Sequence, residues 1–171
     1  MTNSFADLYE RTNAALKDGT ANNPIIVKVS SRNQGGFESR ITLRDHTIVS
    51  DQPHGFEGTD KGPKPSELLL AALAACQEVT WRLYADAMEI PLDGIAIELR
   101  GIQDLRGFLG VDDAVPAGFQ RVEGEVVIDS PASDDELARL RETVDAHCPV
   151  LDDLMRAVPV ALDLKRGSSG S

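Results

Sequence analysis

The sequence is short of cysteine, aromatic residues and positive charge. Two of its 171 residues are cysteine, aromatic residues make up 5%, and Lys and Arg number 17 against 28 Asp and Glu. A chain with a formal net charge of −11 is repelled by phosphate backbones, so nucleic-acid binding is disfavoured. Acidic surfaces also serve solubility alone, and the charge therefore excludes partners better than it identifies one.

Long hydrophobic runs are absent as well. The most apolar window, Leu68 to Ala75, is far shorter than the ~18–20 residues that span a bilayer. The first residues, Met1 to Asp7, lack the basic region and apolar stretch of a signal peptide. We therefore expect a cytoplasmic protein that does not enter a membrane. In that compartment stable disulfides are uncommon, and cysteine pairs are more often redox-active or metal-binding.

Several common cofactor and catalytic motifs are missing. Two cysteines and three histidines could supply a zinc site in number, but no C-x2-C or H-x3-H spacing occurs. The glycines form no phosphate loop, and G-x-S-x-G and HEXXH are absent. Adjacent helical residues point about 100° apart, so His147 is not expected to contact Cys148. We expect neither a metal nor a cofactor.

The hydrophobic pattern predicts one α+β domain over residues 1–166, with an N-terminal helical extension over 1–20 and a flexible tail at 167–171. The tail is rich in glycine and serine. The predicted elements are a helix at 4–17 capped by Ser4, strands at 25–30, 37–44 and 47–50, a helix from Pro65 to about Met88, strands at 95–100 and 118–129, a helix from the Ser133–Glu136 capping box to about Cys148, and a strand at 158–164.

This order, α-βββ-α-ββ-α-β, predicts antiparallel strands packed on two helices. A long glycine- and proline-rich loop at 51–64 joins the first three strands to the central helix. Loops of such length between ordered elements tend to be functional or mobile. Pro149 either ends the helix before it or begins a second, short helix that runs to Met155.

Cys76 lies on the central predicted helix. At 100° per residue its thiol shares a face with Leu69, Leu73 and Thr80. The simplest interpretation is structural, because free cysteine packs as a small hydrophobe and an apolar surround raises the pKa of a thiol. The helix dipole fades within the first turn, about three turns before Cys76, so it cannot lower that pKa.

A reactive Cys76 therefore needs an arginine from elsewhere in the fold. The first three predicted strands, at 25–30, 37–44 and 47–50, form a β-meander. The candidates are Arg32, in the turn between its first two strands, and Arg40, in its second strand. Arg82 stands on the same helix but points about 120° away from Cys76.

Two motifs resemble the OsmC/organic hydroperoxide resistance family. The first is Gly62-Pro-Lys-Pro-Ser-Glu-Leu-Leu-Leu-Ala-Ala-Leu-Ala-Ala-Cys76, and the second is Ala146-His-Cys148-Pro149-Val. The order of elements is similar to that family over about residues 24–165. The similarity is to the OsmC-like branch, and it implies an intertwined homodimer with long central helices and two active sites at the subunit interface.

The resemblance further implies a peroxidase in which Cys76 is the peroxidatic thiolate and Cys148 the resolving thiol. In such chemistry a thiolate attacks the O–O bond, becomes a sulfenic acid and condenses with a second thiol. An external dithiol then reduces the disulfide, so no cofactor is expected. An apolar pocket around Cys76 favours organic hydroperoxides over hydrogen peroxide.

The chain departs from the family pattern at two positions. Family members pair an arginine with a glutamate directly after the proline of the first motif, whereas that position here is Ser66 and the acid is Glu67. One residue is a rotation of about 100° on a helix. The loop at 51–64 also lacks an arginine, so we expect Arg32, with Arg40 second, to activate the thiol. Glu78 is the other acid close to Cys76 in sequence.

These departures leave two other functions open. The chain could be a non-catalytic dimeric scaffold or small-molecule binder with structural cysteines, which predicts a Cys76 pKa near or above the ordinary ~8.5. A thioesterase that wraps a sheet round a long helix is a weaker alternative, because the central helix offers no convincing acid or base.

Overall fold

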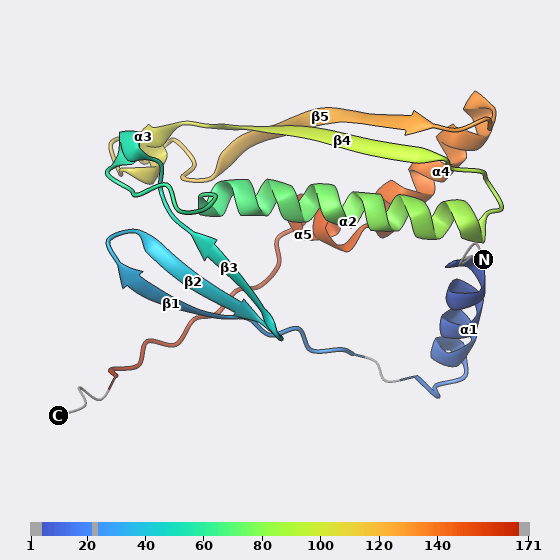
Figure 1. Ribbon diagram of the computed structural model, residues 1–171, viewed down its shortest axis with the longest axis horizontal. Coiled ribbons are helices and arrows are strands. Elements are labelled where there is room, and N and C mark those ends of the chain that lie inside the picture. The colour runs from blue at the N-terminus through green and yellow to red at the C-terminus, as the bar shows by residue number, and fades with distance from the viewer. Residues whose placement is uncertain (1–4, 22–23, 168–171) are drawn as a thin grey trace.

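The computed structural model describes residues 5–21 and 24–167 (Figure 1). Ser4 and residues 168–171 of the predicted tail lie outside this range. In chain order the elements are α1 (Phe5–Lys17), β1 (Ser30–Gly35), β2 (Glu38–Leu43), β3 (His46–Ser50), the 3-10 helix η1 (His54–Phe56), α2 (Pro65–Ala87), β4 (Gly94–Gln103), α3 (Leu105–Phe108), β5 (Phe119–Asp129), α4 (Asp134–His147) and α5 (Pro149–Met155).

The long helix α2 is the centre of the fold. It begins with Pro65 at its first position, as the sequence predicts, and runs for 23 residues. The β4–β5 hairpin lies along α2, α4 and α5 pack against another side of it, and α1 contacts its C-terminal end (Figure 1). The buried core joins the second half of α2 to α4 and the chain around β4; its members are Trp81, Ala85, Ile90, Leu92, Leu140 and Val144.

The predicted capping box at the start of α4 is confirmed. The Ser133 hydroxyl accepts a hydrogen bond from Glu136 N at 3.4 Å, and the Glu136 carboxylate accepts one from Ser133 N at 2.8 Å. These two bonds satisfy backbone donors that a helix start otherwise leaves without partners. The cap therefore fixes where α4 begins, and α4 in turn carries the chain to Cys148.

Both sheets in the described part of the chain are antiparallel. One is the predicted meander, in the order β1-β2-β3, and the other is the β4–β5 pair. Gly35 and Gly36 form the first turn of the meander at φ values of 123° and 52°, a region that favours glycine. The short helix α3 interrupts the connection between β4 and β5. The fold is thus α+β, with a long helix between two antiparallel sheets.

Two of the predicted strands, at 25–30 and 158–164, are wrong: within a single chain these segments do not form the strands that the sequence predicts. Residues 25–29 are extended but unpaired, so β1 begins at Ser30, and the described residues 156–167 contain no strand. The final strand in the order α-βββ-α-ββ-α-β is therefore absent, and α5 ends the sequence of elements. A strand needs a neighbour to pair its backbone groups, and neither segment has one among the residues that the structure describes. Their apolar side chains are left exposed: Ile26 by 79% and Leu162 by 92%.

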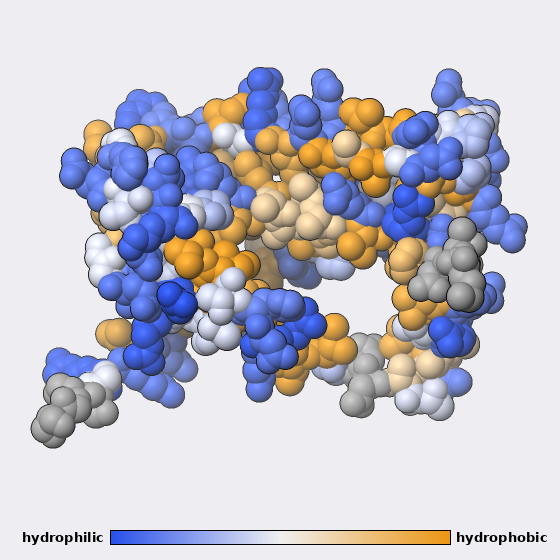
Figure 2. Space-filling model, viewed as in Figure 1, coloured by the Kyte–Doolittle hydropathy of each residue, from blue (hydrophilic) through white to orange (hydrophobic). Residues whose placement is uncertain are grey.

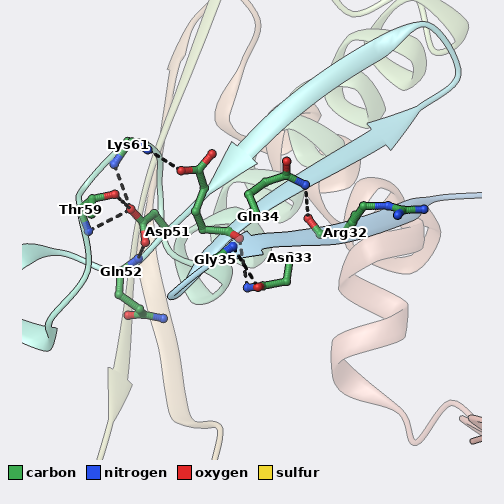
Figure 3. A network of polar contacts seen from close by, with 9 residues as sticks. Arg32, Asn33, Gln34, Gly35, Asp51, Gln52, Thr59 and Lys61 are labelled. Atoms are coloured by element: carbon green, nitrogen blue, oxygen red, sulfur yellow. Dashed lines mark hydrogen bonds and ion pairs between the residues drawn. The ribbon is translucent and has the colours of Figure 1, made fainter. Parts of the chain in front are cut away.

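The loop at 51–64 is ordered by a buried carboxylate. Asp51 is 1% exposed and accepts hydrogen bonds from Thr59 Oγ1 at 2.6 Å, Thr59 N at 3.0 Å and Gln52 N at 2.8 Å (Figure 3). Gly58 allows the chain to fold this tightly, because a Cβ there would lie 1.8 Å from Gln52 O. The loop delivers the chain to Pro65 and so sets where α2 starts.

Apart from Glu67 and Glu78, the exposed residues of α2 are apolar. Its outward residues include three alanines and Val79, which is 68% exposed; the alanines are Ala71, Ala72 and Ala75. Figure 2 shows apolar atoms over the middle of the molecule, where α2 runs, and an opening between α2, α1 and the chain that leads to β1. None of the helices in the described ranges is both long and apolar enough to cross a membrane.

Candidate active site

The two cysteines meet where α2 packs on the junction of α4 and α5. Cys76 lies midway along α2 and is half-buried, whereas Cys148 has 0% exposure. Cys148 ends α4, where its N–H donates to Val144 O at 2.9 Å, and it begins α5, where its carbonyl accepts from Asp152 N at 3.0 Å. Pro149 then occupies the first position of α5. The backbone of Cys148 is therefore held from both sides.

The surroundings of the Cys76 thiol act on its pKa in both directions. Burial is the largest effect and raises the pKa above the ordinary value. The Val150 N–H, which donates to the sulfur, lowers the pKa, and the Thr80 hydroxyl acts in the same direction. The Cys148 thiol, close enough to hydrogen-bond with Cys76, raises it. Within one chain, burial is the stronger influence and the protonated thiol is favoured.

The structure brings two of the four predicted site residues together. Cys76 and Cys148 are neighbours, but Arg32 lies on β1 and is exposed. Figure 3 shows the Arg32 side chain pointing away from the Asp51 network. Arg40 is its cross-strand partner on β2 and is also exposed. Neither guanidinium has an ion-pair partner among the residues described, and neither acts on the Cys76 thiol of its own chain.

Glu67 is also distant from Cys76 in the same chain. The two residues are nine positions apart on α2, which corresponds to roughly 14 Å along a helix. The Glu67 carboxylate instead accepts a hydrogen bond from Lys64 N at 3.0 Å and stabilises the start of α2. The roles predicted for Arg32 and Glu67 in the reaction stay predictions, because a single chain does not contain both sides of an interface.

Sequence reasoning missed the roles of two polar groups that lower the Cys76 pKa, the Val150 N–H and the Thr80 hydroxyl. Thr80 lies on the predicted face of Cys76, and its hydroxyl donates to Cys76 O at 2.7 Å. The signal for Val150 is Pro149, because proline favours the first position of a helix and the N–H groups of a first helical turn have no partner within the helix. That signal identified a short helix but could not show which side chain the N–H meets.

A mainly apolar groove of about 520 Å³ lies between α2, the β4–β5 pair and α5, and neither cysteine lines it. Its floor is the α2 stripe of Leu69, Leu73 and Gln77, and the first two share the face of Cys76. The remaining apolar walls come from the β4–β5 pair and α5: Ile97, Leu99, Phe119, Val122, Val126, Leu151, Leu154 and Met155. Across the described chain, no cluster of His, Cys, Asp or Glu could hold a metal ion.

Comparison with known families gives a match to one. The family described as OsmC-like protein matches residues 58–163, well over half of the chain. The chain belongs to the OsmC-like protein family. The matched residues of this OsmC-like protein include both cysteines and end in the exposed segment after α5, whereas α1 and the meander precede them. Among functionally curated proteins, none matches the sequence.

Solved structures share this OsmC-like fold. An OsmC-like protein from Mycoplasma pneumoniae is 23% identical with a TM-score of 0.67, over 78% of this chain and 89% of that one. An organic hydroperoxide resistance protein OsmC from Legionella pneumophila is 18% identical with a TM-score of 0.60, over 80% and 93%. The organic hydroperoxide resistance protein OhrB of Bacillus subtilis is 24% identical with a TM-score of 0.51, over 82% and 98%.

Proposed function

We propose that this OsmC-like protein is a thiol-dependent peroxidase that reduces organic hydroperoxides. The observation that carries the proposal is the contact between Cys76 and Cys148, which lie far apart in sequence but meet at one site. The names of the Legionella and Bacillus relatives, which refer to organic hydroperoxide resistance, support the same reaction. The family includes cysteine-based peroxidases.

In the proposed reaction the Cys76 thiolate attacks the terminal oxygen of the hydroperoxide. An S–O bond forms, the O–O bond breaks, and the alkoxide leaves as an alcohol after it takes a proton. Cys148 then attacks the sulfenic sulfur, the S–S bond forms and water leaves. An external dithiol restores both thiols and is itself oxidised to a disulfide. The Val150 N–H, which lowers the Cys76 pKa, stabilises the thiolate that starts the cycle.

The groove lined by Leu69 and Leu73 supports an organic substrate. These two residues share the α2 face of Cys76, and the space that they line is large enough for a small hydrocarbon tail. An alkyl or aryl group buries apolar surface there, whereas hydrogen peroxide has none to bury. This groove therefore favours an organic hydroperoxide as the substrate.

We further propose that the site is completed in an intertwined two-fold homodimer. Burial raises the Cys76 pKa within one chain, so the activating arginine has to come from a second subunit. Arg32 and Arg40 stand side by side without carboxylate partners among the described residues, and Glu67 stands at the start of α2. The exposed segments at 25–29 and 158–164 gain strand partners in such an assembly.

A non-catalytic binding protein is the second candidate. The observation that favours it is the raised pKa of Cys76, because a protonated thiol is a poor nucleophile. In this case the groove still binds an apolar molecule, but the two cysteines serve only to pack α2 against α5. Activity after mixing with hydroperoxide separates the two functions directly.

The test is a count of free thiols by mass spectrometry before and after one equivalent of cumene hydroperoxide. We expect both thiols to disappear together and a Cys76–Cys148 disulfide to form. Cys76→Ser should abolish turnover, whereas Cys148→Ser should stop after one turnover as a sulfenic acid that dimedone traps. Survival of both thiols, or multiple turnovers by Cys76→Ser, would contradict the peroxidase and leave the binding protein.

A further inference from the structure

The helix α1 packs on the C-terminal end of α2, outside the residues that match the family. Its first amide, Phe5 N, donates to the Asp86 carboxylate of α2 at 2.8 Å. The positive end of one helix therefore meets a carboxylate near the end of the other, a favourable arrangement of charge. The side of α1 that faces α2 carries half-buried residues three and seven positions apart, namely Ala6, Tyr9 and Asn13. Thus α1 is docked at a defined place.

Aromatic contacts continue from α1 to the end of α4. The rings of Tyr9 and Tyr84 meet edge to face with centroids 5.6 Å apart. Tyr84 in turn contacts the His147 ring, whose centroid lies 5.1 Å away. The His147 ring is also held by its own helix, where Nδ1 donates to Thr143 O at 2.8 Å. A chain of three rings therefore links α1 to the residue before Cys148.

Cys148 is the point at which α4 turns into α5. Its φ and ψ, −75° and 113°, are extended, so the direction of the chain changes at this residue. A disulfide requires the two sulfurs to approach to about 2.05 Å. Cys148 must therefore shift from contact into bonding distance while α4 and α5 stay packed on α2. If the His147–Cys148 turn opens away from α2, the Cys148 sulfur moves out of reach of Cys76.

We infer that α1 is a positioning element for the resolving thiol, acting through Tyr9, Tyr84 and His147 on the turn that holds Cys148. With α1 docked, the turn opens rarely and Cys148 stays beside Cys76. This inference rests on the proposed peroxidase for its consequence: a sulfenic acid at Cys76 is captured by Cys148 before a second hydroperoxide oxidises it to a sulfinic acid. Neither Tyr9 nor Tyr84 contacts the reacting sulfurs.

The direct test measures opening of the turn and needs no hydroperoxide. Cys148 in a Cys76→Ser background is alkylated with iodoacetamide, and its rate is compared with that of the same protein carrying Tyr9→Ala. The rate should rise about two- to tenfold, the change that loss of one aromatic pair produces in an equilibrium constant. Tyr9→Phe, which keeps the ring, should restore the slow rate. Leu8→Ala on the more exposed side of α1 is the matched control and should alkylate slowly.

The second test follows the reaction in proteins with both cysteines. Tyr9→Ala should form sulfenic acid at Cys76 at the unchanged rate but form the disulfide more slowly, with more sulfinic acid per turnover. Equal alkylation rates in the Tyr9→Ala and parent proteins would overturn the inference, and so would an equal rise in Leu8→Ala. If alkylation responds as expected but no Cys76 sulfenic acid forms in any variant, the peroxidase fails while the positioning role of α1 stands.

Discussion

At the scale of single residues, Asp51 shows how a buried charge can order a loop. The Thr59 side-chain hydrogen bond has the largest effect and lowers the Asp51 pKa from 3.8 to about 2, with backbone donors in support. Since the folded-state pKa lies below the ordinary value, the ionised carboxylate stabilises the fold at neutral pH. That contribution is lost as the pH falls through 3.8 towards 2.

We expect Asp51→Asn to lower the stability of the protein at pH 7, because an amide nitrogen would face donors that now reach a carboxylate. The loss should shrink as the pH approaches 2, where Asp51 itself becomes protonated. Urea unfolding at pH 7, 4 and 2.5 measures both effects. Asp60→Asn, at an exposed position of the same loop, is the control, and an equal loss there would contradict the assignment.

At the scale of elements, α4 decides where Cys148 is held. Its buried side consists of Leu140 and Val144, both with 0% exposure, which pack into the core beside Trp81 and Ala85 of α2. The helix is therefore fixed one turn before the Cys148 thiol. The cap at Ser133 fixes its other end.

Leu140→Ala should lower the free energy of unfolding by about 2–5 kcal/mol, because it removes apolar contacts and leaves a cavity in the core. Chemical denaturation measures this change. Arg139→Ala, at an exposed position next to it on α4, should change stability by less than about 0.5 kcal/mol. A loss below about 1 kcal/mol for Leu140→Ala would show that the core relaxes around the cavity.

At the scale of the whole molecule, exposed apolar segments mark what a single chain leaves incomplete. The side chains on one side of the C-terminal segment are among the most exposed, with Val160 at 80% and Leu164 at 99%. Together with the exposed apolar residues of α2, they form the kind of exposed apolar surface that marks an interaction site. The proposed homodimer covers these surfaces.

Leu162→Asp should therefore weaken the homodimer at least about tenfold, since it places a charge where the proposed interface is apolar. Sedimentation analysis over a range of protein concentrations measures the dissociation constant. Asp163→Asn, on the other side of the extended segment, should leave it unchanged. A monomeric parent protein at micromolar concentration would contradict the assembly itself.

Much of the fold could be predicted because its signals are local. The Ser133–Glu136 capping box, Pro65 at the start of α2 and the turn at Gly35 each involve residues within a few positions of one another. The sequence predicts strands at 25–30 and 158–164, but residues 25–29 and 158–164 form no strand with any of the described residues. Alternation of apolar residues predicts that one face of a strand is buried, but it does not predict whether the same chain or a second chain covers that face.

The sequence by itself determined the family motifs, the helix that carries Cys76 and the apolar side on which its thiol stands. Only the tertiary structure decided that Cys148 is the neighbour of Cys76, that the Val150 N–H meets its sulfur, and that α1 reaches His147 through Tyr84. Helical periodicity fixes the direction of a side chain around its own axis. Which other side chain it meets depends on how separate elements pack, and that is settled by the shape of the whole core.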